Sequence, residues 1–444
     1  MNLVYGIHDK PKFHQLLIFA FQQVLAILAA TIAVPAIIGN GMSQSAALFG
    51  AGIGTLVYQL LTKYKSPVYL GSSFAFLGSM GAAFAGAASA SAGHIGLIIG
   101  AIMAGLVYVV IAIVVKFVGV NWINKLMPPA VIGPTVAIIG LSLAGNAVGD
   151  LSTGKVLVNS VSACSPYVAM FCGLVTLFAV IIFSVYGKKM MKLIPFILGI
   201  LAGYVTATLF TVIGLLTNNV ALQVIDFSVF ANMSIFAIPD FTFLNVFEGA
   251  KDLSVSYIAT VAVAYIPVAF VVFAEHIADH KNLSTVIGQD LLTEPGLHRT
   301  LLGDGIGSMA GAFFGGCPNT TYGESVGCVA ITRNASVVTI TTAAIMCIII
   351  SFFGPFVTFL ASIPNCVMGG VCFALYGFIA VSGLKMVQKV DLNQSKNLFV
   401  VSVILIAGIG GLTVSFGKIT LTSIACALIL GILTNILVSK AKDE

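Results

Sequence analysis

Long apolar stretches recur from one end of this 444-residue chain to the other, and they limit what it can fold into. Each stretch runs for roughly 17–25 residues, enough for a helix to cross ~30 Å of hydrocarbon. Only 8% of the residues are charged, whereas a soluble domain carries about 25%. The sequence therefore predicts a membrane protein that crosses the bilayer many times. It excludes a soluble enzyme, a nucleic-acid-binding protein and a disordered chain.

We expect fourteen membrane-spanning segments, and no separate soluble domain. The third and tenth are short and begin with polar, glycine-containing sequence, at residues 69–76 and 318–325. The expected segments are 14–38, 45–62, 68–88, 95–117, 128–147, 166–186, 193–216, 255–278, 300–316, 319–332, 336–361, 365–383, 396–414 and 419–439.

The distribution of basic residues orients these segments. With both termini in the cytoplasm, all but three of the 20 Lys and Arg residues fall on the cytoplasmic side, and the exceptions are Lys155, Lys251 and Lys418. Such a bias is typical of proteins inserted in a cell membrane. Removing one span would invert every later loop and destroy the bias. We therefore expect the two short segments to cross or at least to change side, in a protein of the cytoplasmic membrane.

The chain also contains signs of an internal repeat. Residues 21–23 (Phe-Gln-Gln) lie in the middle of the first span, and residues 273–276 (Phe-Ala-Glu-His) lie at the matching place in the eighth. Two spans later, each half has its interrupted segment. A repeat of seven spans places the two halves inverted in the membrane, and paired broken helices in inverted halves indicate a transporter's binding site. Chance similarity among Gly- and Ala-rich helices is the alternative explanation.

Four of the 15 acidic residues fall within or beside apolar segments, namely Glu275, Asp279, Asp304 and Glu324. An acid at membrane depth is costly and usually faces a cavity in which it has a function. Glu275 and Asp279 are four residues apart, so they share one helix face. Burial penalises the charged form of a carboxyl, which makes all four candidates for carrying a proton. Hydrogen bonding between helices is the alternative role, above all for Asp279 and Asp304.

If the repeat is real, polar groups of the first, third, eighth and tenth segments converge. They would bring Gln22, Gln23, Phe74 and Tyr322 together with two carboxylates and free backbone groups. This set suits a flat, uncharged heterocycle that has N–H donors and carbonyl acceptors. The sequence has no P-loop, GxSxG or HExxH motif, so it predicts neither an ATP-driven pump nor a membrane-embedded hydrolase. We expect no enzyme activity, no cofactor and no metal.

Four motifs carry a resemblance to a known family. They are Leu-Gly-Ser-Ser-Phe-Ala-Phe at 70–76, Ala-Glu-His-Ile at 274–277, Pro-Gly-Leu-His-Arg at 295–299, and Pro-Asn-Thr-Thr-Tyr-Gly-Glu at 318–324, which continues to Thr332 and Arg333. With these motifs the chain resembles the nucleobase–ascorbate transporter family, and most of all its bacterial uracil permeases. The resemblance extends over nearly the whole length.

The resemblance implies an all-α membrane protein whose fourteen segments form a seven-plus-seven inverted repeat. Short strands would precede half-helices in the third and tenth segments. A core domain would combine residues 1–118 and 255–362, and a gate domain would combine residues 119–254 and 363–444. The substrate would bind between the third and tenth segments, near the boundary of the two domains.

The family's activity implies proton-coupled import of uracil by alternating access, in a homodimer surrounded by lipid. The residues implied to contact the substrate are Glu275, Glu324, Phe74, Ala75, Tyr322 and Gly323. The four acids at or near membrane depth, Glu275, Asp279, Glu324 and Asp304, are the residues expected to take part in proton coupling. Those implied to support the site are Gln22, Gln23, Ser73, Asn319 and Ser325.

The chain departs from the uracil permeases at three of these places. Asp279, followed by His280, stands where a His is common, Ser325 replaces an Asn, and Gln23 replaces a His. Asp304 is an acid that purine-transporting relatives often have, whereas the acid at 324, rather than an amide, favours uracil. A xanthine or other purine permease is thus one alternative. An anion channel or exchanger of the same architecture is another, although acids at the site would repel anions.

Overall fold

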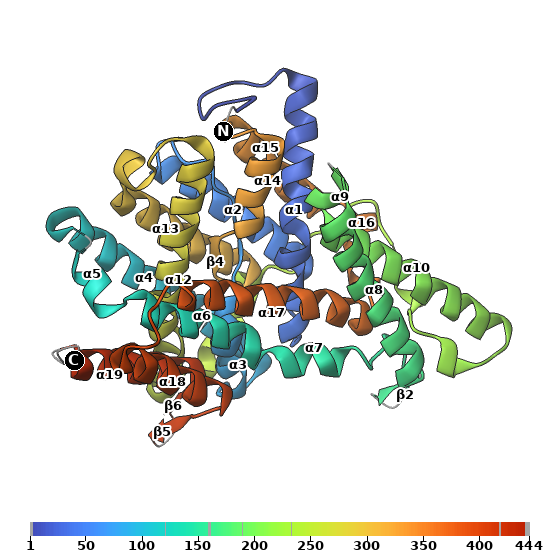
Figure 1. Ribbon diagram of the computed structural model, residues 1–444. Coiled ribbons are helices and arrows are strands. Elements are labelled where there is room, and N and C mark those ends of the chain that lie inside the picture. The colour runs from blue at the N-terminus through green and yellow to red at the C-terminus, as the bar shows by residue number, and fades with distance from the viewer. Residues whose placement is uncertain are drawn as a thin grey trace.

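The computed structural model of the chain is built almost entirely from helices (Figure 1), and it describes residues 3–119, 121–158, 161–188, 190–231, 233–416 and 419–439. The α-helices of the first half are α1 (Phe13–Ile38), α2 (Gln44–Leu61), α3 (Leu77–Ala85), α4 (Ala90–Val118), α5 (Asn121–Leu126), α6 (Pro129–Ser142), α7 (Ala144–Asp150), α8 (Pro166–Tyr186), α9 (Met190–Leu193), α10 (Pro195–Leu216) and α11 (Val246–Gly249). Those of the second half are α12 (Val255–Ile287), α13 (Leu297–Gly315), α14 (Gly323–Thr332), α15 (Val337–Ile350), α16 (Gly354–Ser362), α17 (Asn365–Val387), α18 (Ser395–Ile409) and α19 (Ser423–Val438).

Several of these helices are suited to a bilayer. Among the described residues, seven helical stretches are long and apolar enough to cross a membrane: α1, α4, α6 together with α7, α8, α10, α12 and α17. Shorter apolar helices occur at Phe74–Ala85, α15, α18 and α19. A helix, or a strand followed by a helix, occupies each of the fourteen expected segments, but segments 128–147 and 336–361 each consist of two helices.

The structure also differs from the expectations at the ends of some elements. Helix α12 has 33 residues and continues to Ile287, beyond the expected span 255–278, and it contains Asp279 as the shared helix face with Glu275 requires. Two hairpins that the sequence did not predict join helices, namely β2–β3 (Leu157–Val158 and Val161–Ser162) and β5–β6 (Val414–Phe416 and Ile419–Leu421). Their strands have only two or three residues, too few for a periodic pattern to be visible. The predicted outer Lys418 lies outside the described residues.

The two interrupted segments meet as a pair of antiparallel strands. Strand β1 (Leu70–Ser72) pairs with β4 (Asn319–Thr321), with Gly71 opposite Thr320. A single-turn helix (η1, Phe74–Phe76) and α3 follow β1, whereas α14 follows β4. Because the strands are antiparallel, the helices that follow them leave the pair at its opposite ends. Backbone that is not helical at membrane depth needs internal partners, and here the strands supply them to each other.

One group of helices packs tightly around this strand pair. Helix α13 lies along α2 and α4, while α15 lies against α1 and α2, and α12 lies against α4. The contact of α2 with α13 depends on glycine, because a Cβ atom on Gly50 would lie 2.4 Å from the carbonyl oxygen of Gly311. Small residues allow such close approach of helix backbones inside a membrane. The group therefore combines the first four expected segments with the eighth to the eleventh.

A second group consists of the remaining long helices. Helix α17 packs along α6 and α8, α18 packs against α6 and α19, and α10 packs against α8 (Figure 1). Contacts of α12 with α6 and α19, and of α1 with α10 and α17, join this group to the first. The strand pair and α12 thus lie close to the boundary between the two groups.

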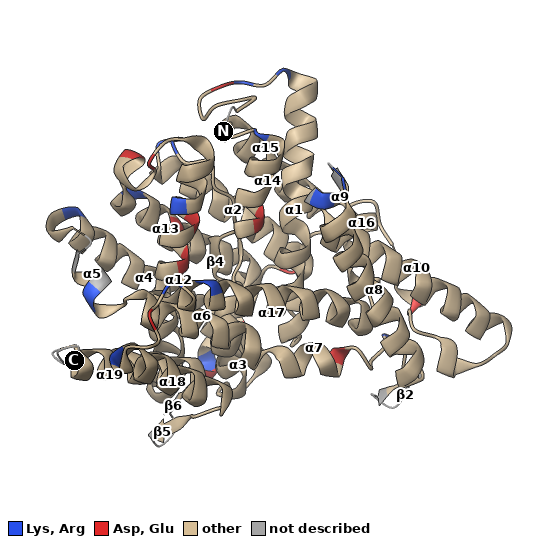
Figure 2. Cartoon of the chain, in the orientation of Figure 1, with Lys and Arg blue, Asp and Glu red and all other residues tan. Residues whose placement is uncertain are grey.

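Charged residues are sparse and unevenly placed. Figure 2 shows Lys and Arg mainly at helix ends and in loops, whereas Asp and Glu also occur in the middle of the molecule, beside α12, α13 and α14. Many large apolar side chains on α8 and α10 are exposed, among them Phe171, Phe178, Ile182 and Leu209. An apolar exterior around a few internal acids is the arrangement expected of a protein surrounded by lipid.

We expect the strand pair to be sensitive to one added methyl group. A Cβ atom on Gly71 would lie 2.5 Å from the ring of Tyr322, so Gly71→Ala should destabilise the fold by about 1–3 kcal/mol through overpacking. Gly81→Ala is the matched control, because no atom lies within 4 Å of a Cβ atom at that helical position. The apparent melting temperatures of the purified proteins test this. Equal melting temperatures for the two variants would contradict it.

Candidate functional site

A cavity of about 400 Å³ opens where the strand pair meets α12 and the second group of helices. One wall comes from the interrupted segments and α12, and the other from α6, α10 and α17. The residues that line it are Ser73, Phe74, Ala75, Val136, Ile139, Phe196, Glu275, Ala278, Asp279, Asn282, Thr320, Thr321, Tyr322, Gly323, Glu324, Leu375, Phe378, Ile379, Ser382 and Met386.

Helix α12 presents three polar side chains to this cavity. Glu275, Asp279 and Asn282 all line it, and their spacing of four and three residues places them on one helix face. The sequence predicted the first two but missed Asn282. The same periodicity could have found it, since it lies less than one turn beyond Asp279 on the face already singled out.

The second of these acids is tied to the strand pair. The hydroxyl of Thr321, the last residue of β4, donates a hydrogen bond of 2.7 Å to Oδ2 of Asp279. This bond joins α12 to β4 and therefore connects the segments that carry Glu275 and Glu324. Threonine on a strand gave no signal for this in the sequence, because the partner is 42 residues away.

The start of α14 forms the opposite polar edge. Gly323 and Glu324 are its first two residues, and both line the cavity. The first N–H groups of a helix have no partner within the helix, and the helix N-terminus carries partial positive charge. This edge therefore combines one carboxyl group with backbone donors that can bind a carbonyl oxygen.

Aromatic residues flank the polar groups. Phe74 lines the cavity and packs edge-to-face on Tyr376 of α17, with ring centroids 6.0 Å apart, and Ala75 lies beside it. Tyr322 also lines the cavity, but its hydroxyl donates a 2.7 Å hydrogen bond to the carbonyl oxygen of Ser72. Tyr322 therefore offers its ring rather than its hydroxyl to a ligand, and it stabilises the strand pair at the same time.

The wall formed by the second group is mostly apolar. Its residues are Val136, Ile139, Phe196, Leu375, Phe378, Ile379 and Met386, with Ser382 as the polar exception. Sequence reasoning named none of them, because an apolar residue in an apolar helix looks the same whether it faces lipid, protein or a cavity. Because this wall is apolar, most hydrogen bonds to a ligand must come from the polar wall, which belongs to the first group of helices.

The predicted supporting residues lie mainly behind the cavity. Gln23 on α1 donates a hydrogen bond to the hydroxyl of Ser325 on α14, and Asn319 on β4 donates one of 3.1 Å to the carbonyl oxygen of Gly50. Ser73 lines the cavity, and its backbone N–H is bonded to Pro318. Gln22 lies on α1, outside the cavity lining. These contacts fix the interrupted segments to α1 and α2.

Asp304 is not brought to the cavity with the other three acids. It is the eighth residue of α13 and only 1% exposed, and its Oδ2 lies 2.7 Å from Nδ1 of His276. His276 follows Glu275 in the sequence, lies roughly 100° further round α12, and does not line the cavity. The structure therefore separates Asp304 from Glu275, Asp279 and Glu324.

A polar cavity between broken helices, inside a protein of apolar helices, defines a multi-pass membrane transporter. Residues 14–417 match the model of the Permease family. The uracil permease of Bacillus caldolyticus is 39% identical over 437 residues, which cover 98% of this chain and 94% of that protein. The uracil permease of Escherichia coli K12 is 34% identical over 429 residues, which cover 96% and 92%. The chain belongs to the nucleobase–ascorbate transporter family, whose members are permeases and not enzymes.

Solved structures resemble the fold as well. The transmembrane domain of the cyanobacterial bicarbonate transporter BicA matches with a TM-score of 0.63 at 16% identity, covering 97% of this chain and all of that domain. The murine anion transporter Slc26a9, in its inward-facing state, matches with a TM-score of 0.66 at 12% identity, covering 97% of this chain and 69% of that one. At such low identity the likeness shows a shared transporter fold alone.

The bond between Thr321 and Asp279 gives a test of how the site is held together. Thr321→Val keeps the shape of the side chain but removes the donor, so we expect it to destabilise the protein by about 1–3 kcal/mol. Thr321→Ser keeps the hydroxyl and should retain most of the stability. Thermal unfolding of the three purified proteins is the measurement. A Val variant that melts with the wild type would show that the bond does not stabilise the site.

Proposed function

We propose that this chain imports uracil together with protons across the cytoplasmic membrane, by alternating access. The observation that carries the proposal is that Glu275 on α12 and Glu324 on α14 line one cavity between two paired, interrupted segments. Uracil permeases at 34–39% identity over nearly the whole chain support the choice of substrate.

The cavity suits the chemistry of uracil. The ring is flat and uncharged, and it carries two N–H donors and two carbonyl acceptors. Glu275 and Glu324 can accept from the N–H groups, while the backbone N–H groups at the start of α14 can donate to a carbonyl oxygen. Phe74 and the ring of Tyr322 can pack against the base. Buried polar groups that pair with a matching ligand discriminate strongly against analogues that lack those groups.

Proton coupling follows from the acids that share the cavity. Glu275, Asp279 and Glu324 line it, and the described residues of its lining include no Lys, Arg or His. Carboxylates that share a site without a counter-ion repel each other, and the repulsion falls when one of them binds a proton. Proton binding thus lowers the negative charge that stays buried while the site, with uracil bound, changes its exposure from one side of the membrane to the other. Asp304, which lies away from the cavity, has no place in this step.

Alternating access would use the two groups of helices as two bodies. The core domain, residues 1–118 and 255–362, holds the polar wall, and the gate domain, residues 119–254 and 363–444, holds the apolar wall. An apolar surface has few bonds to break when the core domain moves along it. The proposal includes the fourteen-span, seven-plus-seven inverted repeat with both termini in the cytoplasm. It also includes a homodimer whose contact uses part of the lipid-facing surface.

The two glutamates give the main test. We expect Glu275→Gln and Glu324→Gln each to lower uptake of radiolabelled uracil by about tenfold or more, since a hydrogen bond to a charged group contributes roughly 1.5–3 kcal/mol. Glu248→Gln, the same change at an exposed acid outside the cavity, is the matched control and should transport normally. Full uptake by both cavity variants would remove the basis of the proposal.

Substrate and coupling can be tested in the same uptake assay. Unlabelled uracil should compete with the tracer, whereas xanthine and uric acid should compete weakly. Uptake should rise with an inward proton gradient and fall when the gradient is collapsed. Stronger competition by xanthine would identify a purine permease. Uptake that ignores the proton gradient and follows chloride or bicarbonate would identify an anion exchanger.

A further inference from the structure

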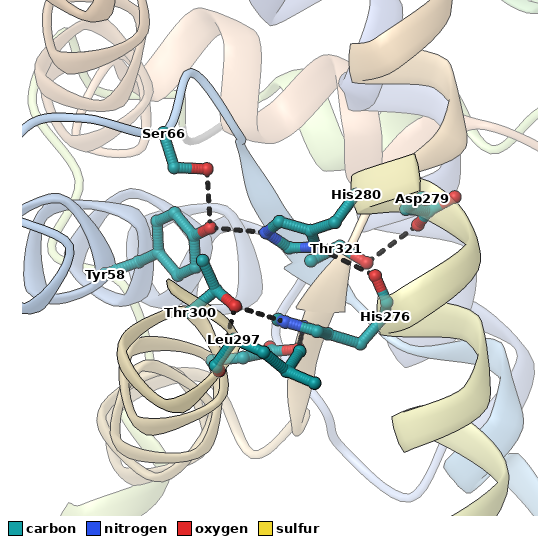
Figure 3. Close-up of polar contacts among 9 residues, drawn as sticks. Tyr58, Ser66, His276, Asp279, His280, Leu297, Thr300 and Thr321 are labelled. Carbon is teal, nitrogen blue, oxygen red and sulfur yellow. Dashed lines mark hydrogen bonds and ion pairs between the residues drawn. The ribbon is translucent and has the colours of Figure 1, made fainter. Parts of the chain in front are cut away.

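A second buried polar cluster lies between α12 and α13, and none of its three residues lines the cavity. Nδ1 of His276 lies 2.7 Å from Oδ2 of Asp304 on α13. Nε2 of His276 lies 3.0 Å from the hydroxyl of Thr300, also on α13 (Figure 3). All three residues are at most 1% exposed. The cluster therefore joins α12 to α13 at the level of Glu275 without contact with solvent.

The hydrogen-bond directions determine the charge of the pair. The single hydroxyl proton of Thr300 is donated to the carbonyl oxygen of Leu297, at 3.1 Å, so Thr300 accepts from Nε2–H of His276. One proton then remains between Nδ1 of His276 and Oδ2 of Asp304. Whichever atom holds it, the pair has zero net charge. A pair of zero net charge avoids the cost of an unpaired buried charge.

The other oxygen of Asp304 faces a very small cavity. This cavity of about 10 Å³ is lined by Asp304, Tyr108 of α4 and Asn319 of β4, among others. Three of their atoms are buried and have no hydrogen-bond partner in the described part of the chain: Oδ1 of Asp304, Oδ1 of Asn319 and the hydroxyl of Tyr108. One water, donating to the two Oδ1 atoms and accepting from the tyrosine hydroxyl, would satisfy all three. The cavity is about the size of one water.

Among the described residues, the hydrogen bonds around the pair reach no other carboxyl group. On α12, His280 stacks on His276 with ring centroids 4.0 Å apart, and it bonds the hydroxyl of Tyr58 on α2 at 2.7 Å. Tyr108 packs edge-to-face on His276. The acids Glu275 and Asp279 share α12 but line the main cavity instead. Nδ1 of His280 bonds the backbone carbonyl of His276, which ends the chain of exchangeable protons there.

We propose that Asp304 is a positioning residue and carries no transported proton. Through His276 it holds α12, and through one buried water shared with Asn319 and Tyr108 it holds β4 and α4. It thereby sets the relative placement of the two segments that bear Glu275 and Glu324, and the pair keeps zero net charge throughout the transport cycle. This inference rests on the proposed function, because its effect is seen through uracil binding and proton coupling.

The test compares two substitutions at one position. Asp304→Asn can donate from its amide to Nδ1 of His276 and accept at its oxygen from the water. We expect it to accumulate uracil with the same dependence on external pH as the wild type. Asp304→Leu has a similar size but no polar atom. We expect it to weaken uracil binding to purified protein by about tenfold, a factor that corresponds to 1.4 kcal/mol.

The outcomes separate this inference from the proposed function. If the wild type neither binds nor transports uracil, the proposed function fails. If the wild type does both, while Asp304→Asn binds uracil but loses proton-driven accumulation, Asp304 carries the proton and the inference is wrong.

Tyr108→Phe covers the case in which Asp304→Leu does not fold. It removes one partner of the water, and we expect binding about two- to tenfold weaker with an unchanged pH profile. Wild-type binding by Tyr108→Phe would overturn the inference.

Discussion

The pairing of β1 with β4 is the contact on which the rest of the site depends. These strands are short, and they lie where the bilayer would leave backbone groups without water, so each strand completes the hydrogen bonds of the other. The residues that follow the two strands, 73–75 after β1 and 322–324 after β4, line the same cavity. Without this pair, Phe74 and Glu324, which are 250 positions apart in the sequence, would have no reason to line the same cavity.

Helix α12 presents its acids and its first histidine to different neighbours. One face carries Glu275 and Asp279 into the cavity, and the other carries His276 into contact with Asp304. The bond from Thr321 to Asp279 joins the cavity face to β4. Among the described residues no basic side chain lines the cavity beside these acids, which suits the proposed proton binding, whereas Asp304 on α13 is paired with His276.

Much of the architecture was predictable from the sequence, because apolar length and helical period are local properties. They indicated the helices, the interrupted segments and the shared face of Glu275 and Asp279. They did not indicate that Asp304 faces His276, because periodicity says which residues share a face but not what that face meets. The apolar wall with Ile139 and Phe378 could not be predicted from the sequence either, since its side chains resemble those that face lipid.

The central claim is that ring N–H groups of uracil are bound by carboxylates between the paired segments. The most direct measurement is the apparent melting temperature of the purified protein with uracil or with 1,3-dimethyluracil, which keeps the flat ring but lacks both N–H donors. A ligand that binds only the folded state raises this temperature by mass action. We expect uracil to raise it and the dimethyl compound to leave it unchanged. Equal stabilisation by both compounds, or none by uracil, would contradict the claim.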